Sequence, residues 1–258
     1  MKHFLIAAAA LCPAWSAAFA QGGDDLRVRV GLGAQVSPEF VGADDSAIGP
    51  LLDLDFARGS NEFAFEAPDY SFGIPVVSTG VFSFGPAANF ESKRKESDVG
   101  AAVGKVSTTL EVGGFAEYQA GKSFRLRGDL RKGLGGHDGV VGSFGADYIQ
   151  RDGDRYVFSV GPRVLVSNAR FQRAYFGVDA PAALATGLPV YQPSGGIYAV
   201  AATSGLSYQF NDRFGLFGYA RYERLVGDAA KSPIIRELGS RNQLSGGLGL
   251  SYTFNIKR

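Results

Sequence analysis

Apolar and polar residues alternate along much of this chain, and the clearest example lies near its end, between residues 244 and 254. The apolar side chains there fall on one side of a period-two repeat: Leu244, Leu248, Leu250, Tyr252 and Phe254. The positions on the other side are serine, glycine or threonine. Successive side chains of a strand point to opposite faces. The pattern therefore predicts a strand that is apolar toward lipid and polar toward a lumen, as in a transmembrane β-barrel.

Further stretches repeat this alternation. Strands are predicted over residues 27–36, 52–56, 109–118, 124–131, 140–150, 156–167, 198–210 and 214–223. The segment 61–90 holds three apolar runs that prolines interrupt, the first of them around Phe63 and Phe65. Because proline is poorly tolerated in central strands, this segment forms either three short strands or one long strand with an irregular approach.

The connections between these stretches alternate in length. Short ones lie near 57–60, 119–122, 151–154 and 211–212, and long ones at 37–49, 91–108, 133–139, 168–195 and 225–243. Short periplasmic turns and long outer loops are typical of outer-membrane barrels, which have an even number of strands. We therefore expect an all-β fold, a transmembrane antiparallel up-and-down β-barrel of twelve strands, with ten as the alternative. Its first and last strands should pair, with both ends on the periplasmic side.

A soluble secreted β-sandwich is the competing interpretation, because its strands alternate too. It rarely needs so many strands of about ten residues. Composition fits many strands joined by tight turns, since the 258 residues include 36 Gly, 20 Phe and 11 Tyr. The 26 basic and 25 acidic residues nearly cancel, which argues against nucleic acid as a partner, because such binders need a clustered basic surface.

Residues 1–20 resemble a secretory signal peptide, with Lys2 near the start, a short apolar run and an Ala18-Phe19-Ala20 cleavage site. The remaining residues, 21–258, would form a single outer-membrane domain of a Gram-negative bacterium. The chain has one cysteine, Cys12. Its removal with the signal would leave no disulfide, thiolate nucleophile or cysteine-ligated metal.

The polar faces of the predicted strands carry many charges. The candidate lumen charges are Arg27, Arg29, Asp53, Asp55, Glu111, Glu117, Arg125, Arg127, Asp129, Arg131, Arg163, Arg221 and Glu223. They could select solutes that pass through the barrel, or they could pair with one another and fill it. Pairing is favoured, because a buried charge must be compensated and a twelve-stranded barrel is too narrow for an open general porin.

We expect no catalytic, cofactor-binding or metal-binding residues. A barrel that hydrolyses lipid would need a serine and a histidine in hydrogen-bond reach of each other. The one histidine outside the signal, His137, lies in a glycine-rich stretch, where we expect a mobile loop and a local turn role, and Ser143 should face inward. The paired aspartates at 44–45 and 152–154 fall short of the six to eight oxygens that calcium takes. The glycine-rich residues 133–145 lack the Lys-Ser/Thr of a phosphate loop.

Several blocks in order resemble the MipA/OmpV family of outer-membrane proteins, the MltA-interacting proteins. They are residues 31–33, 37–44, 50–54, 85–90, 135–139, 175–178, 191, 195–196, 224–225, 228–235 and 252–254. The resemblance implies an outer-membrane barrel. In one class of members it also implies a scaffold that links a lytic transglycosylase to a bifunctional penicillin-binding protein in peptidoglycan synthesis.

We therefore expect a non-enzymatic structural or scaffold protein in outer-membrane lipid that contacts periplasmic peptidoglycan-synthesising and -cleaving enzymes. A narrow channel for small solutes is the alternative, because other members of the family resemble small-solute pores. A barrel that hydrolyses lipid is a remote third possibility.

Overall fold

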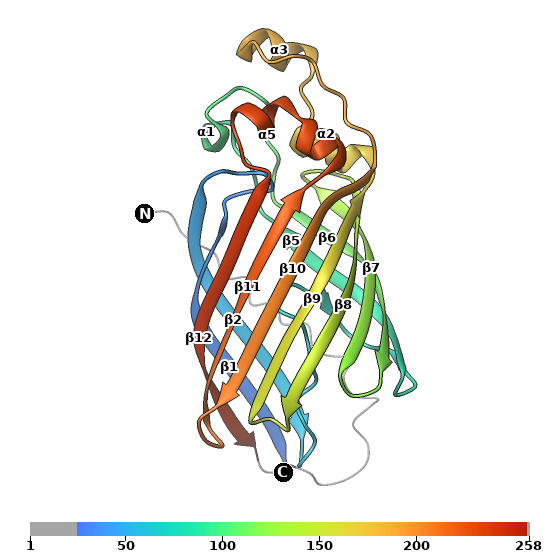
Figure 1. Ribbon diagram of the computed structural model, residues 1–258, viewed down its shortest axis with the longest axis vertical. Helices are drawn as coiled ribbons and strands as arrows, with labels where there is room; N and C mark the ends of the chain where they lie inside the picture. The colour runs from blue at the N-terminus through green and yellow to red at the C-terminus, as the bar shows by residue number, and fades with distance from the viewer. Residues whose placement is uncertain (1–24, 257–258) are drawn as a thin grey trace.

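The computed structural model describes residues 25–256, so the predicted signal peptide lies outside the described residues. Within that range, twelve strands form one curled antiparallel sheet (Figure 1). Ten are long: β1 (Leu26–Pro38), β2 (Ser46–Arg58), β5 (Phe82–Glu91), β6 (Thr109–Ala120), β7 (Phe124–Gly135), β8 (Val140–Asp152), β9 (Tyr156–Ser167), β10 (Gly196–Gln209), β11 (Phe214–Leu225) and β12 (Asn242–Ile256). Two are short, β3 (Phe72–Gly73) and β4 (Val77–Ser78), and both pair with β5. The expected twelve-stranded up-and-down architecture is confirmed.

The strand order is β2-β1-β12-β11-β10-β9-β8-β7-β6-β5-β3. The first and last strands are neighbours, paired from Leu26 with Ile256 to Val36 with Gly246, as the sequence predicted. β2 and β3 stand at the two ends of this order. The wall is therefore interrupted between β2 and the two short strands β3 and β4, which we call the β3–β4 pair although each pairs with β5. We call this interruption the seam.

Residues 61–71 follow β2 but form no strand. The prediction of a strand around Phe63 and Phe65 was wrong. Both side chains are buried, and polar atoms of this segment contact side chains that the opposite wall directs into the lumen. We call residues 61–71 the lumen segment. Its alternation is the same as that of a wall strand, but here the apolar face packs on arginines inside the barrel.

The wall strands are apolar outside and polar inside. Leu32, Leu52 and Leu248 are 66%, 71% and 61% exposed, whereas Ser251 and Thr253 in β12 are buried. Exposed leucines in the middle of strands are unfavourable in water, and they form the lipid-facing surface that a transmembrane barrel requires.

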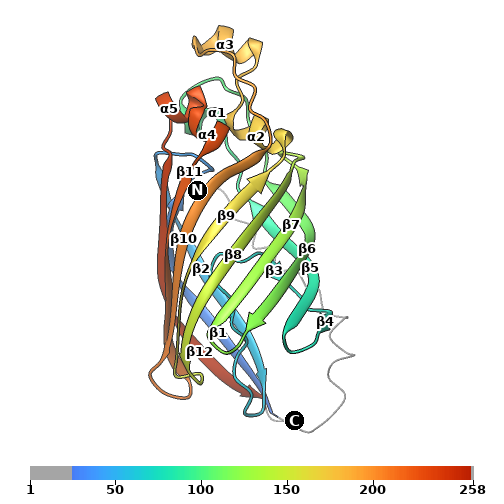
Figure 2. The same cartoon turned by 45° about the vertical axis from the view of Figure 1, so that its right-hand side comes forward.

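The two ends of the barrel differ (Figures 1 and 2). Tight turns and the end of β12 lie at one end. The other end carries the helices α1 (Glu96–Val99), α2 (Ala169–Phe176), α3 (Ala180–Thr186), α4 (Gly227–Lys231) and α5 (Pro233–Glu237). By the loop-length rule, we expect the tight turns to be periplasmic and the helical end to be outside. No helix between residues 25 and 256 is long and apolar enough to cross a membrane.

An apolar cluster packs at the outer end, and we call it the outer cap. It is built from Phe171, Tyr175 and Phe176 of α2, packed with Tyr198 and Ile235. Residues 91–107 carry a run of charged side chains that is typical of a solvated loop, but Arg94 within this run is buried. Its side chain is 1% exposed and donates to the backbone oxygens of Tyr175 (2.6 Å), Gly104 (3.1 Å) and Val103 (3.4 Å). A charged residue in a polar run thus ties the loop to the cap.

Candidate functional site

The predicted lumen charges point inward and are paired. Near the periplasmic end, Arg27 lies 3.0 Å from Asp154, and Arg29 pairs with Asp55 and, at 3.5 Å, with Asp53. Arg29 thus ties β1 to its neighbour β2, whereas Arg27 reaches across the barrel to the turn between β8 and β9.

On β6 and β7 the alternating charges form a ladder across the strand pair. Glu117 contacts Arg127 at 3.0 Å and Arg125 at 3.6 Å. Nearer the outer end, Glu111 accepts from Arg131 at 2.9 Å, and Arg131 also pairs with Asp129. Cross-strand pairs of opposite charge stabilise a sheet, and here they also neutralise the lumen.

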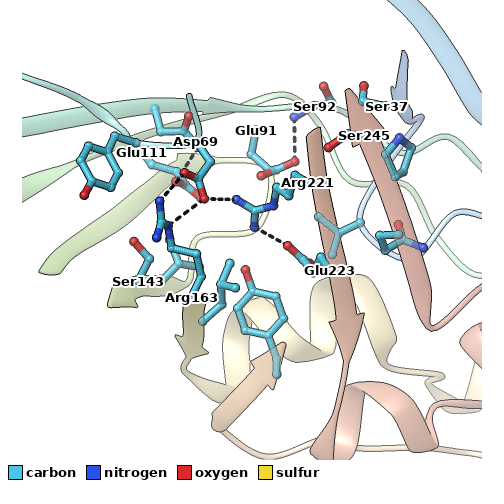
Figure 3. A pocket seen from close by; sticks show the side chains of 18 of the residues that line it. Ser37, Asp69, Glu91, Ser92, Glu111, Ser143, Arg163, Arg221, Glu223 and Ser245 are labelled. Atoms are coloured by element: carbon cyan, nitrogen blue, oxygen red, sulfur yellow. Dashed lines mark hydrogen bonds and ion pairs between the residues drawn. The ribbon is translucent and has the colours of Figure 1, made fainter. Parts of the chain in front are cut away.

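Asp69 of the lumen segment is the centre of the remaining pairs (Figure 3). Its carboxylate accepts from Arg163 (3.0 Å, both oxygens), Arg221 (2.7 Å) and Thr203 (2.8 Å). Arg221 pairs in addition with Glu223. A two-oxygen contact with arginine is among the strongest hydrogen-bonded arrangements in proteins, so Asp69 fixes the lumen segment to β9, β10 and β11.

Three further contacts hold the lumen segment. Arg125 donates to the backbone oxygen of Phe65, Arg127 donates to that of Ser71 at 2.9 Å, and the Tyr70 hydroxyl donates to Asp147. Arginine side chains also cover its aromatic rings. The guanidinium carbons of Arg29 and Arg125 lie 4.7 Å and 5.0 Å from the ring centres of Phe63 and Phe65, respectively, within the range of cation–π attraction.

A cavity of about 320 Å³ lies between the lumen segment and the outer cap. Asp69 and Tyr70 line one side of it, Phe171 and Tyr198 another. Its polar lining includes Arg131 and, as labelled in Figure 3, Glu91, Glu111, Ser143, Arg221 and Glu223. Charges of both signs around a small volume suit a small polar or charged solute.

His137 corrects another expectation, because it is buried rather than placed in a mobile loop. Its Nδ1 accepts from the backbone N–H of Gly139 at 3.0 Å, and its Nε2 lies 3.1 Å from Glu111. Since Nδ1 accepts, Nε2 carries the proton and donates to Glu111. The ring also packs edge-on against Phe171 at 5.0 Å. Both nitrogens are engaged, and Ser143, which faces inward as expected, donates instead to Asp129 at 2.8 Å.

Sequence reasoning found the charges on wall strands and missed Asp69 and Asp147. Asp147 follows the alternation of β8, and its inward position could have identified it. Asp69 could not be found in this way, because it lies between Pro68 and Tyr70 outside any strand. In the described part of the chain, no three Asp, Glu, His or Cys side chains gather as a metal ion would require.

One of the comparisons with known proteins identifies a family. A family model described as "MltA-interacting protein MipA" matches residues 30–254. No curated protein matches the chain. Among solved structures, an outer membrane channel from Pseudomonas putida F1 is 10% identical (91% of this chain and 97% of that chain covered, TM-score 0.43). The outer membrane channel DcaP of Acinetobacter baumannii is 10% identical (90% and 97% covered, TM-score 0.40). The NanC porin is 11% identical (88% and 98% covered, TM-score 0.38).

Proposed function

The chain belongs to the MltA-interacting protein family MipA, and from this premise we propose that it is a non-enzymatic scaffold of the outer membrane. It is an outer-membrane β-barrel protein. Its proposed partners are a lytic transglycosylase, to which the family name refers, and a bifunctional penicillin-binding protein. Both would dock at the periplasmic end of the barrel and be held there beside the peptidoglycan.

The observation that carries this proposal is the occupied lumen. Asp69 contacts Arg163 and Arg221 inside the barrel, and an apolar cap packs over the outer end. Both features favour a barrel whose resting state serves as a fixed body rather than an open pore. Docking then depends on the surface that the barrel presents to the periplasm.

That surface consists of the tight turns, from which exposed basic side chains project: Lys122, Arg155 and Arg213. Exposed charges at the rim of an interface steer association and contribute modestly to affinity. We expect these three residues to contribute to binding of the transglycosylase.

The test is a pull-down of a purified lytic transglycosylase with the detergent-solubilised barrel. Replacing Lys122, Arg155 and Arg213 together with glutamate should weaken binding by about tenfold, since about 0.5 kcal/mol for each exposed charge sums to about 1.4 kcal/mol. The matched control replaces Lys93, Lys105 and Arg236, which are exposed at the outer end, with glutamate. Equal loss in both variants, or no binding by the unaltered protein, would contradict a periplasmic docking role.

A narrow channel for small solutes is the second candidate, and the cavity of about 320 Å³ with its charged lining favours it. Conductance of single molecules in planar bilayers separates the two candidates. A scaffold should bind the transglycosylase and show little resting conductance, whereas a constitutive channel should conduct whether or not it binds.

The non-enzymatic part of the proposal rests on His137. Its ring is enclosed by Glu111, Gly139 and Phe171, so neither nitrogen is available to activate a serine. We expect no lipid hydrolysis by the purified protein in mixed micelles. Hydrolysis that disappears in His137→Ala would overturn this assignment.

A further inference from the structure

The seam places two strand edges in the bilayer. Within residues 25–256, β2 has a strand neighbour on one side only, and the opposite edge is formed by the two short strands β3 and β4. Hydrocarbon offers no hydrogen bonds to backbone N–H and C=O groups, and each such unsatisfied group is costly in a membrane. A strand that could insert between β2 and the β3–β4 pair would remove this cost.

The lumen segment is long enough to form such a strand, and it already has a turn at each end. Asn61 N–H donates to Arg58 O at 3.0 Å, and Tyr70 N–H donates to Ala67 O at 3.0 Å. Residues 61–67 therefore already lie between two turns. The first turn contains Gly59 at φ +52°, the positive φ that two-residue hairpin loops favour. The second has Pro68 at the position where β-turns favour proline.

Continuing the first turn as a hairpin fixes the register, with Asn61 opposite Arg58. Phe63 then lies opposite Phe56, Phe65 opposite Leu54, and Ala67 opposite Leu52. Leu52 and Leu54 are exposed on the lipid face, so all three apolar residues of the segment would join that face. A shift of one residue would turn every side chain to the other face, so the match depends on this register.

We propose that residues 61–67 exchange between two positions, inside the lumen and in the seam as a wall strand, and that the second position opens a conducting path for small solutes. Moving into the wall withdraws Asp69 from Arg163 and Arg221 and the Phe65 backbone oxygen from Arg125. Each of these arginines loses one of its partners. Each keeps another carboxylate partner on the wall, Asp147, Glu223 or Glu117, so the lumen becomes wider while its charges stay paired.

This inference deepens the second candidate function, since it rests on a barrel that can conduct, and it is independent of docking. The test uses a cysteine pair, Leu54→Cys with Phe65→Cys. Directly opposite positions of neighbouring strands are close enough for a disulfide. In the lumen position the pair is far from bonding geometry, because Leu54 faces lipid while Phe65 is buried against Arg125.

The matched control is Val30→Cys with Leu54→Cys, which are opposite each other in the β1–β2 ladder and should cross-link in either state. In oxidised proteoliposomes, the Leu54–Phe65 pair should cross-link and give steady conductance that dithiothreitol reverses. The control pair should cross-link without a change in conductance. Failure of the Leu54–Phe65 pair alone to cross-link, or cross-linking without conductance, would overturn the proposal.

A second variant needs no cross-link. Asp69→Asn weakens the contacts with Arg163 and Arg221 and should raise the frequency of channel openings by about tenfold, the effect of losing one charge-assisted hydrogen bond. Unchanged openings in a folded Asp69→Asn protein would also overturn the proposal. The transglycosylase pull-down on the same variants reports separately on docking, so the docking proposal and the channel proposal can be contradicted independently.

Discussion

At the residue scale, Arg94 is the buried cation of the outer cap. Replacing it with methionine would remove the side-chain donor from three backbone oxygens, the buried ones of Tyr175 and Val103 and the partly buried one of Gly104. We expect the cap to be destabilised by about 2–3 kcal/mol, the cost of unsatisfied buried acceptors. Limited proteolysis of residues 91–107 should show faster cleavage. Lys93→Met, at an exposed neighbouring position, should leave the cleavage rate unchanged, and equal rates in both variants would contradict the role of Arg94.

Asp228 links two outer loops and should make their packing depend on pH. Its carboxylate accepts from the hydroxyl of Ser194 at 2.6 Å and from the Ser194 N–H at 3.0 Å. These hydrogen bonds hold the pKa of Asp228 below its ordinary value. A lowered folded-state pKa adds stability above the unfolded-state value, about 3.9, and the stability is lost as the pH falls through the folded-state value.

Hydrogen exchange of residues 187–195 should therefore accelerate as the pH falls from 5 toward 3, after correction for the intrinsic rate. In Asp228→Asn, exchange should be faster at pH 5 and should lose most of this dependence. A wild type whose corrected exchange is flat across this range would rule out the carboxylate as the link.

The wall charges could be predicted from the sequence because a period of two assigns each residue to a face. Asp69 and His137 could not. Asp69 lies in a segment that forms no strand. His137 is buried against Phe171 of α2, which lies far along the chain. Local patterns carry no information about such packing.

At the scale of elements, β12 allows a direct test of which face meets lipid. Leu248→Arg places a charge on the outer face near the middle of the strand and should cost about 2–4 kcal/mol of folding free energy in a bilayer. Leu184→Arg is the same change on α3, where the side chain is 90% exposed at the outer end, and should be nearly neutral. The measurement is unfolding by guanidinium in lipid vesicles. Equal stability of the two variants would mean that β12 does not face lipid there.

The strands were predictable and the helices were not, for a physical reason. A wall strand repeats its alternation over about ten residues, but α1, α4 and α5 contain only four or five residues each, too few for a helical period. The lumen segment shows the opposite error, because its alternation predicts a wall strand that does not form. Phe63 and Phe65 alternate as lipid-facing residues do, but their rings pack against arginines of the wall strands inside the barrel.

At the scale of the whole molecule, the two ends should face different compartments. An epitope inserted at Gly187, which follows α3 and is exposed, should be labelled on intact cells. One inserted at Gly121, in the turn after β6, should be labelled only after the outer membrane is permeabilised. The reverse labelling would mean that the barrel has the opposite orientation, with its helical end in the periplasm.

The pairing of β1 with β12 also bears on how the protein reaches its folded state. Residues from opposite ends of the chain, such as Leu26 and Ile256, must meet before the first strand gains its second neighbour. Contacts between such distant residues make folding slow, on the order of milliseconds to seconds or longer. Throughout that time β1 offers a free edge to any other chain. A chain that ends before β12 can never cover this edge, so truncated products should aggregate or be degraded instead of accumulating in the membrane.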